Sequence, residues 1–169
     1  PTDVAALLRE VQAIFRYKVQ EKHLFFRLDC PAGLPLFLLD SLRLRQILLN
    51  LTGNAVKFTD SGAVRLIIEQ RIVRQTQAFV HFEVADTGCG MDRHMLARLW
   101  QPFEQESAEV AQEHGGSGLG LSIVKSLVTL MGGAVKAETV QGVGTSFFVD
   151  LPFGRVVGEH APRIRGLGE

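Results

Sequence analysis

The stretch LRLRQILLNLTGNAVKFT, residues 42–59, constrains the fold more than any other part of the chain. Its apolar residues recur at steps of three or four, which predicts an amphipathic helix with one buried face. That face consists of Leu44, Ile47, Leu48, Leu51, Ala55 and Phe58. A polar stripe beside it contains Arg43, Gln46, Asn50, Asn54 and Lys57. Asparagine has a poor helix propensity, so the stripe is either a partly exposed helix edge or a binding site.

The composition indicates one globular domain. The chain has 169 residues, of which 46% are hydrophobic and 21% charged. Eighteen basic residues balance eighteen acidic ones, so no net charge argues for nucleic acid or a membrane surface. No apolar run reaches the roughly 20 residues that cross a bilayer, and the first residues do not resemble a signal peptide. Cys30 and Cys89 form no metal-binding spacing, and so few cysteines indicate a reducing compartment. We expect a cytoplasmic, monomeric domain without nucleic-acid or membrane contacts, in a parent protein that can be membrane-anchored.

Periodicity and breaker residues predict the elements of this domain. Helices are expected over residues 4–22, 42–59, 91–100 and 118–131, and the second has Asp40 or Ser41 as its cap. Strands are expected over residues 24–29, 63–74, 78–85, 134–139 and 145–151. Helices and strands do not alternate regularly, so we predict an α+β fold with helices on one face of a sheet. Residues 1–153 would form the domain, and residues 154–169 a tail or linker.

The most glycine-rich element is GGSGLGLS, residues 115–122, which leads directly into a predicted helix. Glycines let the backbone approach a ligand, and free N–H groups at a helix start attract phosphate oxygens; the alternative is a flexible hinge. The element is not a P-loop, because Leu121 follows Gly120 where that motif needs lysine. It is not the dinucleotide fingerprint either, because no strand directly precedes it.

Two further glycine clusters follow predicted strands or turns. In DTGCG, residues 86–90, Asp86 could accept a hydrogen bond from an exocyclic amine, and Gly88 and Gly90 leave room for a flat ring. Taken alone, this cluster is better explained as a strand-end turn with Asp86 as its cap. The cluster GVGT, residues 142–145, is likewise consistent with a hairpin turn.

Together these elements resemble the catalytic and ATP-binding domain of sensor histidine kinases, especially the hybrid type. The wider group includes type II topoisomerases, the ninety-kilodalton heat-shock chaperones and mismatch-repair ATPases. The resemblance covers residues 2–153, with the motifs in the family's order. Residues 42–59 match the N box, DTGCG the first glycine box, Phe103-Glu-Gln the F box, GGSGLGLS the second glycine box and GVGT the third. It implies the Bergerat fold: a two-layer sandwich with a mixed, mostly antiparallel sheet and a mobile ATP lid over residues 101–117.

The resemblance also implies roles for individual residues. Asn54 would ligate Mg²⁺, Asn50 would lie near the metal or its waters, and Lys57 would reach the phosphates. Phe58 would pack against adenine, Asp86 would bind its amino group, and Thr145 would line the base site. Further nucleotide-binding positions are Gly88, Gly90, Phe103, Gly116, Ser117, Gly118, Leu119 and Gly120.

Asn50 distinguishes phosphoryl transfer from hydrolysis. The hydrolytic branches of the family have a glutamate four residues before the magnesium asparagine, where it activates water. An amide cannot take a proton near neutral pH, whereas a neutral histidine is already nucleophilic. With Asn50, Asn54 and Lys57 as catalytic residues, the sequence predicts transfer of the γ-phosphate of ATP to histidine.

The acceptor histidine is expected outside this chain. The five histidines, His23, His81, His94, His114 and His160, do not lie in an acceptor motif of the family. The expected partners are the histidine-bearing dimerisation domain of the parent kinase and a response regulator or receiver domain. Gln112 stands where the family commonly has a cation, which leaves a nucleotide-binding regulatory module without transfer as an alternative. An ATPase of the topoisomerase or chaperone type is a further alternative.

Overall fold

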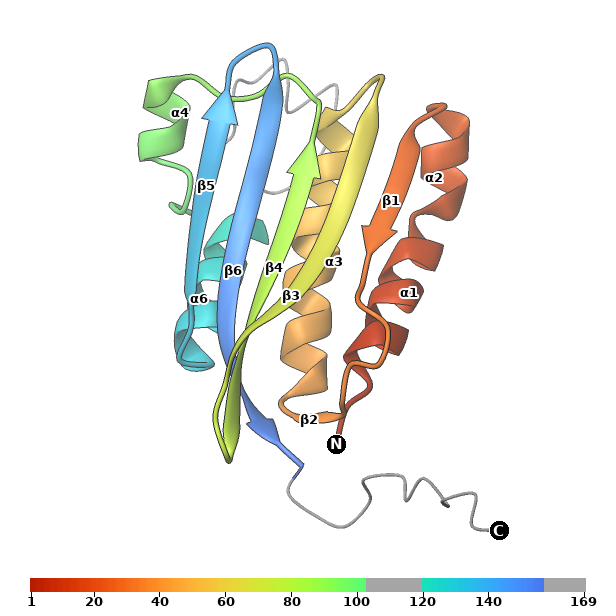
Figure 1. Ribbon diagram of the computed structural model, residues 1–169. Helices are drawn as coiled ribbons and strands as arrows, with labels where there is room; N and C mark the ends of the chain where they lie inside the picture. Colours follow the sequence, from red (N-terminus) through yellow and green to blue (C-terminus); the bar gives the residue numbers. More distant parts are fainter. Residues whose placement is uncertain (103–119, 157–169) are drawn as a thin grey trace, which may run out of the picture.

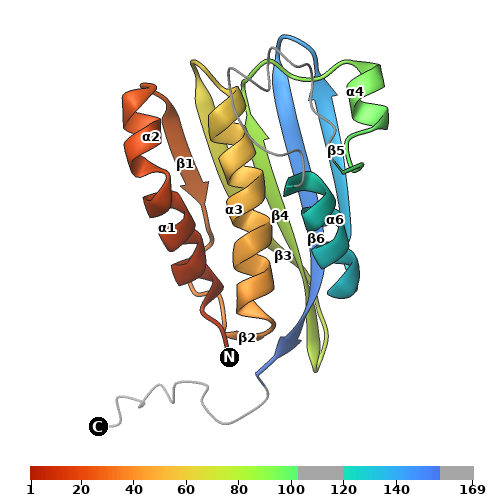
Figure 2. The same ribbon diagram turned by 180° about the vertical axis from the view of Figure 1, so that it is seen from behind.

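The computed structural model describes residues 1–102 and 120–156 and shows two layers. Helices α1 (Val4–Ile14), α3 (Ser41–Phe58) and α6 (Gly120–Leu130) lie across one face of a six-stranded sheet (Figures 1 and 2). Helix α2 (Arg16–Glu21) continues beyond α1, and the short α4 (Arg93–Ala97) stands beside the sheet edge. The two-layer α+β fold predicted from the sequence is confirmed.

The sheet is mixed and mostly antiparallel. Its strands are β1 (Phe25–Asp29), β2 (Phe37–Leu38), β3 (Ala63–Val73), β4 (Gln77–Asp86), β5 (Ala134–Val140) and β6 (Gly144–Arg155). The order is β1-β3-β4-β6-β2, and β5 also pairs with β6. Strands β1 and β3 run parallel, and the other pairs run antiparallel. The β3–β4 hairpin contains a register shift between Gln70 and Ile72, which the loose alternation in the sequence does not reveal.

Alternate residues of each strand face the helices and form the core. On β4 and β6 this inner series is Ala78, Val80, Phe82, Val84 and Phe147, Val149, Leu151, Phe153, all nearly inaccessible to solvent. Leu44, Ile47, Leu48 and Leu51 of α3 pack on it and are fully buried. Burying each of these side chains contributes about 1.5–3 kcal/mol. The apolar stripe predicted for residues 42–59 is therefore the helix side of the core.

The first predicted helix, residues 4–22, is in fact two helices. The chain leaves helical geometry at Phe15 (φ −93°, ψ 1°), between α1 and α2. The ring of Phe15 lies over Gly53 of α3, where a Cβ would be 3.5 Å from it. This packing joins residues far apart in the sequence, so periodicity within residues 4–22 could not predict the break.

Three further elements differ from what the sequence predicts. Strand β6, expected over residues 145–151, continues through Pro152 to Arg155, so Gly154 and Arg155, expected in the tail, belong to the sheet. The two-residue strand β2 was not expected; it pairs with Gly154 and Arg155 at the end of β6. The helix expected over residues 91–100 is confined to Arg93–Ala97. In contrast, Asp40 caps α3 as expected, because its Oδ1 accepts a hydrogen bond from Arg43 N at 3.2 Å.

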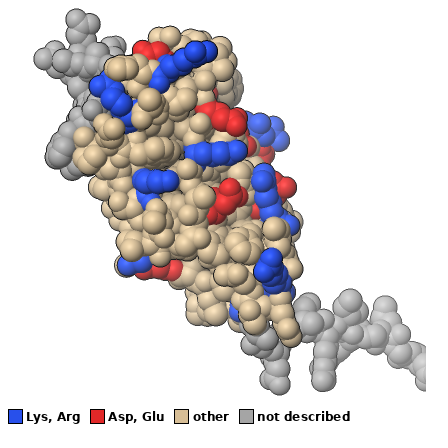
Figure 3. Space-filling view, turned by 90° about the vertical axis from the view of Figure 1, so that its left-hand side faces the viewer, with Lys and Arg blue, Asp and Glu red and all other residues tan. Residues whose placement is uncertain are grey.

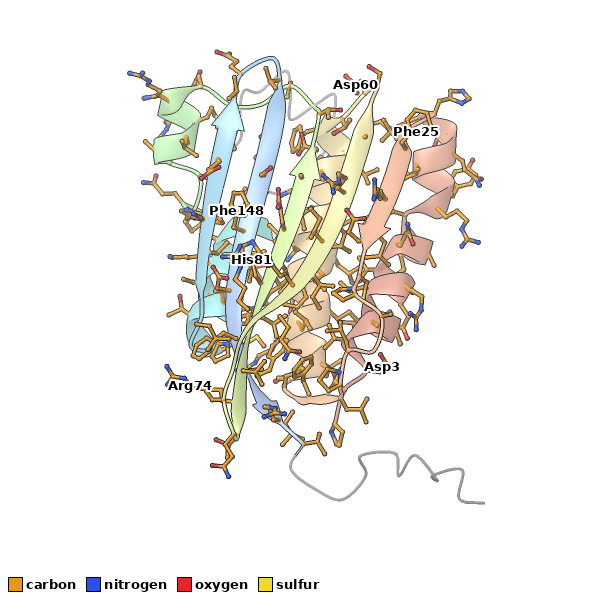
Figure 4. The ribbon with its side chains drawn as sticks, viewed as in Figure 1. Asp3, Phe25, Asp60, Arg74, His81 and Phe148 are labelled. Carbon is orange, nitrogen blue, oxygen red and sulfur yellow. The ribbon has the colours of Figure 1, made fainter. Side chains whose placement is uncertain are left out.

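The other face of the sheet has no covering helix in the part of the chain that the structure describes (Figure 1). His81 of β4 is nevertheless 5% exposed, because its ring stacks on Phe148 and its Nδ1 lies 2.7 Å from Asp150 Oδ1 (Figure 4). Acidic and basic side chains are interspersed over the molecular side that carries α4 and β5 (Figure 3). Of the described helices, none is long and apolar enough to cross a bilayer.

Candidate functional site

Helix α3 divides its polar stripe into two halves. Arg43 and Gln46, near its start, are exposed, whereas Asn50, Asn54 and Lys57 in its second half are partly buried. Buried Ile47, Leu51 and Ala55 lie beside them on the helix and fix its orientation against the sheet. The second half of the stripe is therefore no ordinary solvated edge, where charged side chains would be fully exposed.

Asn50 lies against the start of α6. A Cβ on Gly120, the first residue of that helix, would be 3.8 Å from Asn50 Cγ and Oδ1. The Nδ2 atom of Asn50 is buried and has no hydrogen-bond partner among the described residues. A buried amide usually finds a partner, so this donor is one that a bound ligand could satisfy.

Lys57 and Phe58 lie together at the end of α3. The Nζ atom of Lys57 is 5.3 Å from the centroid of the Phe58 ring, within cation–π range. Partial burial lowers the pKa of Lys57 below its ordinary value of 10.5. A cation and an aromatic ring are thus presented side by side at this helix end.

The loop after β4 packs against the same helix end. Asp86 Oδ1 accepts a hydrogen bond from Gly88 N at 2.8 Å, and a Cβ on Gly88 would collide with the carbonyl oxygen of Phe58. Gly90 has φ 66°, and a Cβ there would collide with the carbonyl of Val140. These close approaches require glycine and pack the DTGCG loop against the end of α3 at Gly88 and against the end of β5 at Gly90.

Burial raises the pKa of Asp86 above its ordinary value of 3.8. Backbone hydrogen bonds from Gly88 and Thr145 oppose that shift by stabilising the carboxylate. Asp86 is therefore a partly desolvated acceptor held in place by the backbone. Such an acceptor can bind a donor strongly, because water competes less for it.

Asp86 belongs to a polar row across three strands. Asp86 pairs with Thr145 of β6, which pairs with Thr139 of β5, so all three side chains lie on the inner face. Thr139 Oγ1 accepts from Met91 N at 2.9 Å, donates to Gly144 O at 3.1 Å and lies 3.0 Å from Thr145 Oγ1. Sequence analysis missed Thr139, although its place opposite Thr145 in the expected hairpin was available as a signal.

The last turn of α3, with Lys57 and Phe58, thus lies against the loop that follows Asp86, and Asn54 and Asn50 lie about one and two turns earlier on the same helix. Gly88, Gly90, Thr145 and Gly120 complete this group of sequence-predicted positions. Phe103, Gly116, Ser117, Gly118 and Leu119 lie outside the described residues, as do Gln112 and most of the expected lid.

The residues present fit a magnesium ion that is held mainly by phosphates. In residues 1–102 and 120–156, no three His, Cys, Asp or Glu side chains form a group that could hold a metal. Carboxamide oxygens are hard ligands, and Mg²⁺ is typically bound by one or two protein oxygens together with waters and substrate phosphates. Asn54, with Asn50 one turn earlier, supplies such oxygens on one side of α3.

The sequence is similar to a known protein family and to sensor kinases of known name. Residues 39–155 match the family described as "Histidine kinase-, DNA gyrase B-, and HSP90-like ATPase". The autoinducer 2 sensor kinase/phosphatase LuxQ of Vibrio parahaemolyticus is 39% identical over 155 residues, or 90% of this chain and 18% of LuxQ. The signal transduction histidine-protein kinase BarA of Escherichia coli is 34% identical over 152 residues, or 89% of this chain and 17% of BarA. The chain thus spans less than a fifth of the length of these curated relatives.

The fold is also similar to solved structures of histidine kinases. Full-length ShkA in complex with AMPPNP superposes with a TM-score of 0.78 at 38% identity, covering 94% of this chain and 32% of ShkA. The nucleotide-free catalytic domain of the histidine kinase ThkA has a TM-score of 0.75 at 22% identity, covering 89% of this chain and 93% of that domain, which supports the fold alone. The chain therefore belongs to the family of histidine kinase-, DNA gyrase B- and HSP90-like ATPases, and within that family it is similar to the catalytic domains of histidine kinases.

Proposed function

We propose that this domain binds Mg-ATP at the polar row and transfers the γ-phosphate to a histidine on the dimerisation domain of its parent kinase. A receiver domain or response regulator would then take the phosphoryl group. The observation that carries this proposal is Asn50, which stands where the hydrolytic branches have their glutamate base and is packed against Gly120. An acceptor imidazole needs no such base, because its neutral ring nitrogen attacks the phosphorus directly as the bond to ADP breaks.

The phosphate end of the site would lie along α3. Asn54 would give its side-chain oxygen to Mg²⁺, and the buried Nδ2 donor of Asn50 would face the phosphates or the metal's waters. Lys57 would bind phosphate oxygens; as a flexible point charge it can follow the nucleotide as it enters. The metal would neutralise charge on the transferring phosphoryl group.

The adenine end would lie at the polar row. Asp86 would accept from the exocyclic amino group, with Gly88 giving room for the ring and Phe58 beside it. Thr145 would line the base site, held by its contact with Thr139 at 3.0 Å. The raised pKa of Asp86 supports this assignment, because perturbed acids cluster at functional sites.

Two measurements test the proposal in sequence. Titration calorimetry with an ATP analogue should show binding that strengthens with Mg²⁺. The domain, mixed with the separately produced dimerisation domain of its parent and radiolabelled ATP, should then label the acceptor histidine. A folded, nucleotide-bound domain that leaves the acceptor unlabelled would refute transfer. Steady ATP hydrolysis that disappears in Asn50→Ala would show a hydrolase instead.

A further inference from the structure

Lys22, at the end of α2, makes an unusual set of contacts with a distant helix. Its Nζ atom donates to the carbonyl oxygens of Val56, Lys57 and Thr59 at 2.8, 3.0 and 3.0 Å. An ammonium group has three protons, so each of them is directed at a main-chain oxygen. The Lys22 side chain is 17% exposed, and its Nζ atom also lies 3.7 Å from Asp60 Oδ1. Figure 4 places Asp60 at the end of the molecule where α3 finishes.

These contacts close the end of α3. The last four carbonyl groups of any α-helix have no partner within the helix. In α3 they belong to Ala55, Val56, Lys57 and Phe58. Thr59 Oγ1 donates to the first at 2.6 Å, Lys22 donates to the second and third, and the fourth faces Gly88. A cation at a helix C-terminus is also favoured by the helix dipole.

The turn after α2 brings Lys22 to this position. His23 has φ 57°, a left-handed conformation, and the N–H groups of His23 and Leu24 bond back to Gln20 O and Val19 O at 3.1 and 2.9 Å. Helix α2 therefore ends at Glu21 with Lys22 as its C-cap, and the chain turns into β1. As the last residue before this turn, Lys22 lies close enough to α3 for its side chain to span the two helix ends.

The last turn of α3 carries two residues of the proposed nucleotide site. Lys57 offers its side chain to that site while its own carbonyl is held by Lys22, and Phe58 meets the glycine loop through its carbonyl. Without the ammonium, the last two or three carbonyls would turn toward water, and the helix end would fray. Fraying would move Lys57 and Phe58 relative to Asp86.

We propose that Lys22 is a positioning residue for the nucleotide site, acting through the last turn of α3 and not through contact with the nucleotide. This inference rests on the function proposed above. It assigns α2 and the β1 turn, which carry none of the sequence-predicted site residues, a part in nucleotide binding. It also accounts for the burial of this lysine, since three carbonyl oxygens lie closer to its ammonium group than the exposed carboxylate of Asp60 does.

The test compares four variants by calorimetric titration with an ATP analogue and Mg²⁺, at a temperature where each is fully folded. Lys22→Met should weaken binding about tenfold, as the loss of an outer support around a ligand site does. Lys22→Arg, which keeps a cation and several donors, should restore most of the affinity. Lys18→Met, on the same helix, removes only an exposed ion pair with Glu21 and should bind like wild type. Val11→Ala destabilises the core far from the site and should lower the melting temperature without changing affinity.

The outcomes separate the inference from the proposed function. Wild-type affinity in Lys22→Met would overturn the inference alone, and so would an equal loss of affinity in Val11→Ala. If Lys22→Met does not fold, Lys22→Gln keeps two donors on a shorter side chain and should weaken binding about threefold, less than the loss of all three donors. Unchanged affinity in that variant would overturn the inference equally. A folded wild-type domain that binds no nucleotide would refute the proposed function and the inference together.

Discussion

The two ends of the inner sheet face differ in what they bury, although the same strands supply both. At one end Phe37, Phe82 and Phe153 pack with ring centroids 5.5 and 6.1 Å apart and are inaccessible to solvent. At the other end Asp86 and Thr145 occupy the same alternating series on β4 and β6. The first end contributes stability through apolar burial. The second end partly buries a carboxylate, which costs free energy, and the proposed hydrogen bond from the adenine amino group would offset that cost.

The largest effect on stability should follow from removing a buried ring at the aromatic end of the sheet. Phe153→Ala removes a fully buried ring and should lower the free energy of unfolding by about 3–5 kcal/mol, as measured by urea denaturation. Nucleotide affinity measured below the melting transition should be unchanged, because Phe153 lies at the end of β6 away from Thr145. Val156→Ala, a control beside it at a partly exposed side chain, should leave stability almost unchanged. A parallel loss of affinity in Phe153→Ala would show that the two ends are not independent.

The next largest effect should be the loss of nucleotide affinity when Asp86, at the polar end, is changed. Asp86→Asn should weaken binding of adenine nucleotides by about 10–100-fold, since a hydrogen bond to a charged group contributes ~1.5–3 kcal/mol. The variant should remain folded in circular dichroism and should melt no earlier than wild type, because the buried charge is gone. Asp29→Asn removes a carboxylate that pairs with Arg27 and Arg65 on β1 and β3 and should not affect affinity. Unchanged calorimetric affinity in Asp86→Asn would remove Asp86 from its proposed role.

The partly buried carboxylate of Asp86 should also make the stability of the protein depend on pH. Because the folded-state pKa of Asp86 is raised, the folded protein binds this proton more readily than the unfolded chain. The ionisation of Asp86 therefore lowers the free energy of unfolding as the pH rises from the ordinary pKa of 3.8 through the raised pKa of the folded state. The advantage of Asp86→Asn over wild type should be smallest below pH 3.8 and grow above it. An advantage that is constant with pH would contradict the burial of this charge.

The smallest effect should come from Thr139, which supports the polar row. Thr139→Val keeps the shape but leaves Met91 N without its acceptor, at a cost of about 1–3 kcal/mol if no water replaces it. Nucleotide affinity should fall modestly, because Thr145 loses its hydroxyl partner. Thr139→Ser retains the hydroxyl and should behave like wild type in both calorimetry and melting. Equal behaviour of the valine and serine variants would show that the network does not hold the site.

Much of the fold was predictable where the signal was local. The period of residues 42–59 and the cap at Asp40 predicted α3 almost to the residue, and β3 and β4 lie where two strands were expected. The break at Phe15 was missed because its cause is Gly53 on another helix. Strand β2 was missed because two residues carry no period, and only pairing with Gly154 and Arg155 makes them a strand.

Local sequence signals were enough to predict a helix with asparagines and a lysine on one edge, glycine-rich turns after it, and a carboxylate at a strand end. Those features depend on period, propensity and turn chemistry, which act between close neighbours in the chain. In contrast, the row of Asp86, Thr145 and Thr139 and the capping of α3 by Lys22 became apparent only in the folded chain. Strand register and capping by a distant side chain depend on which segments meet, and that follows from burying the whole core at once.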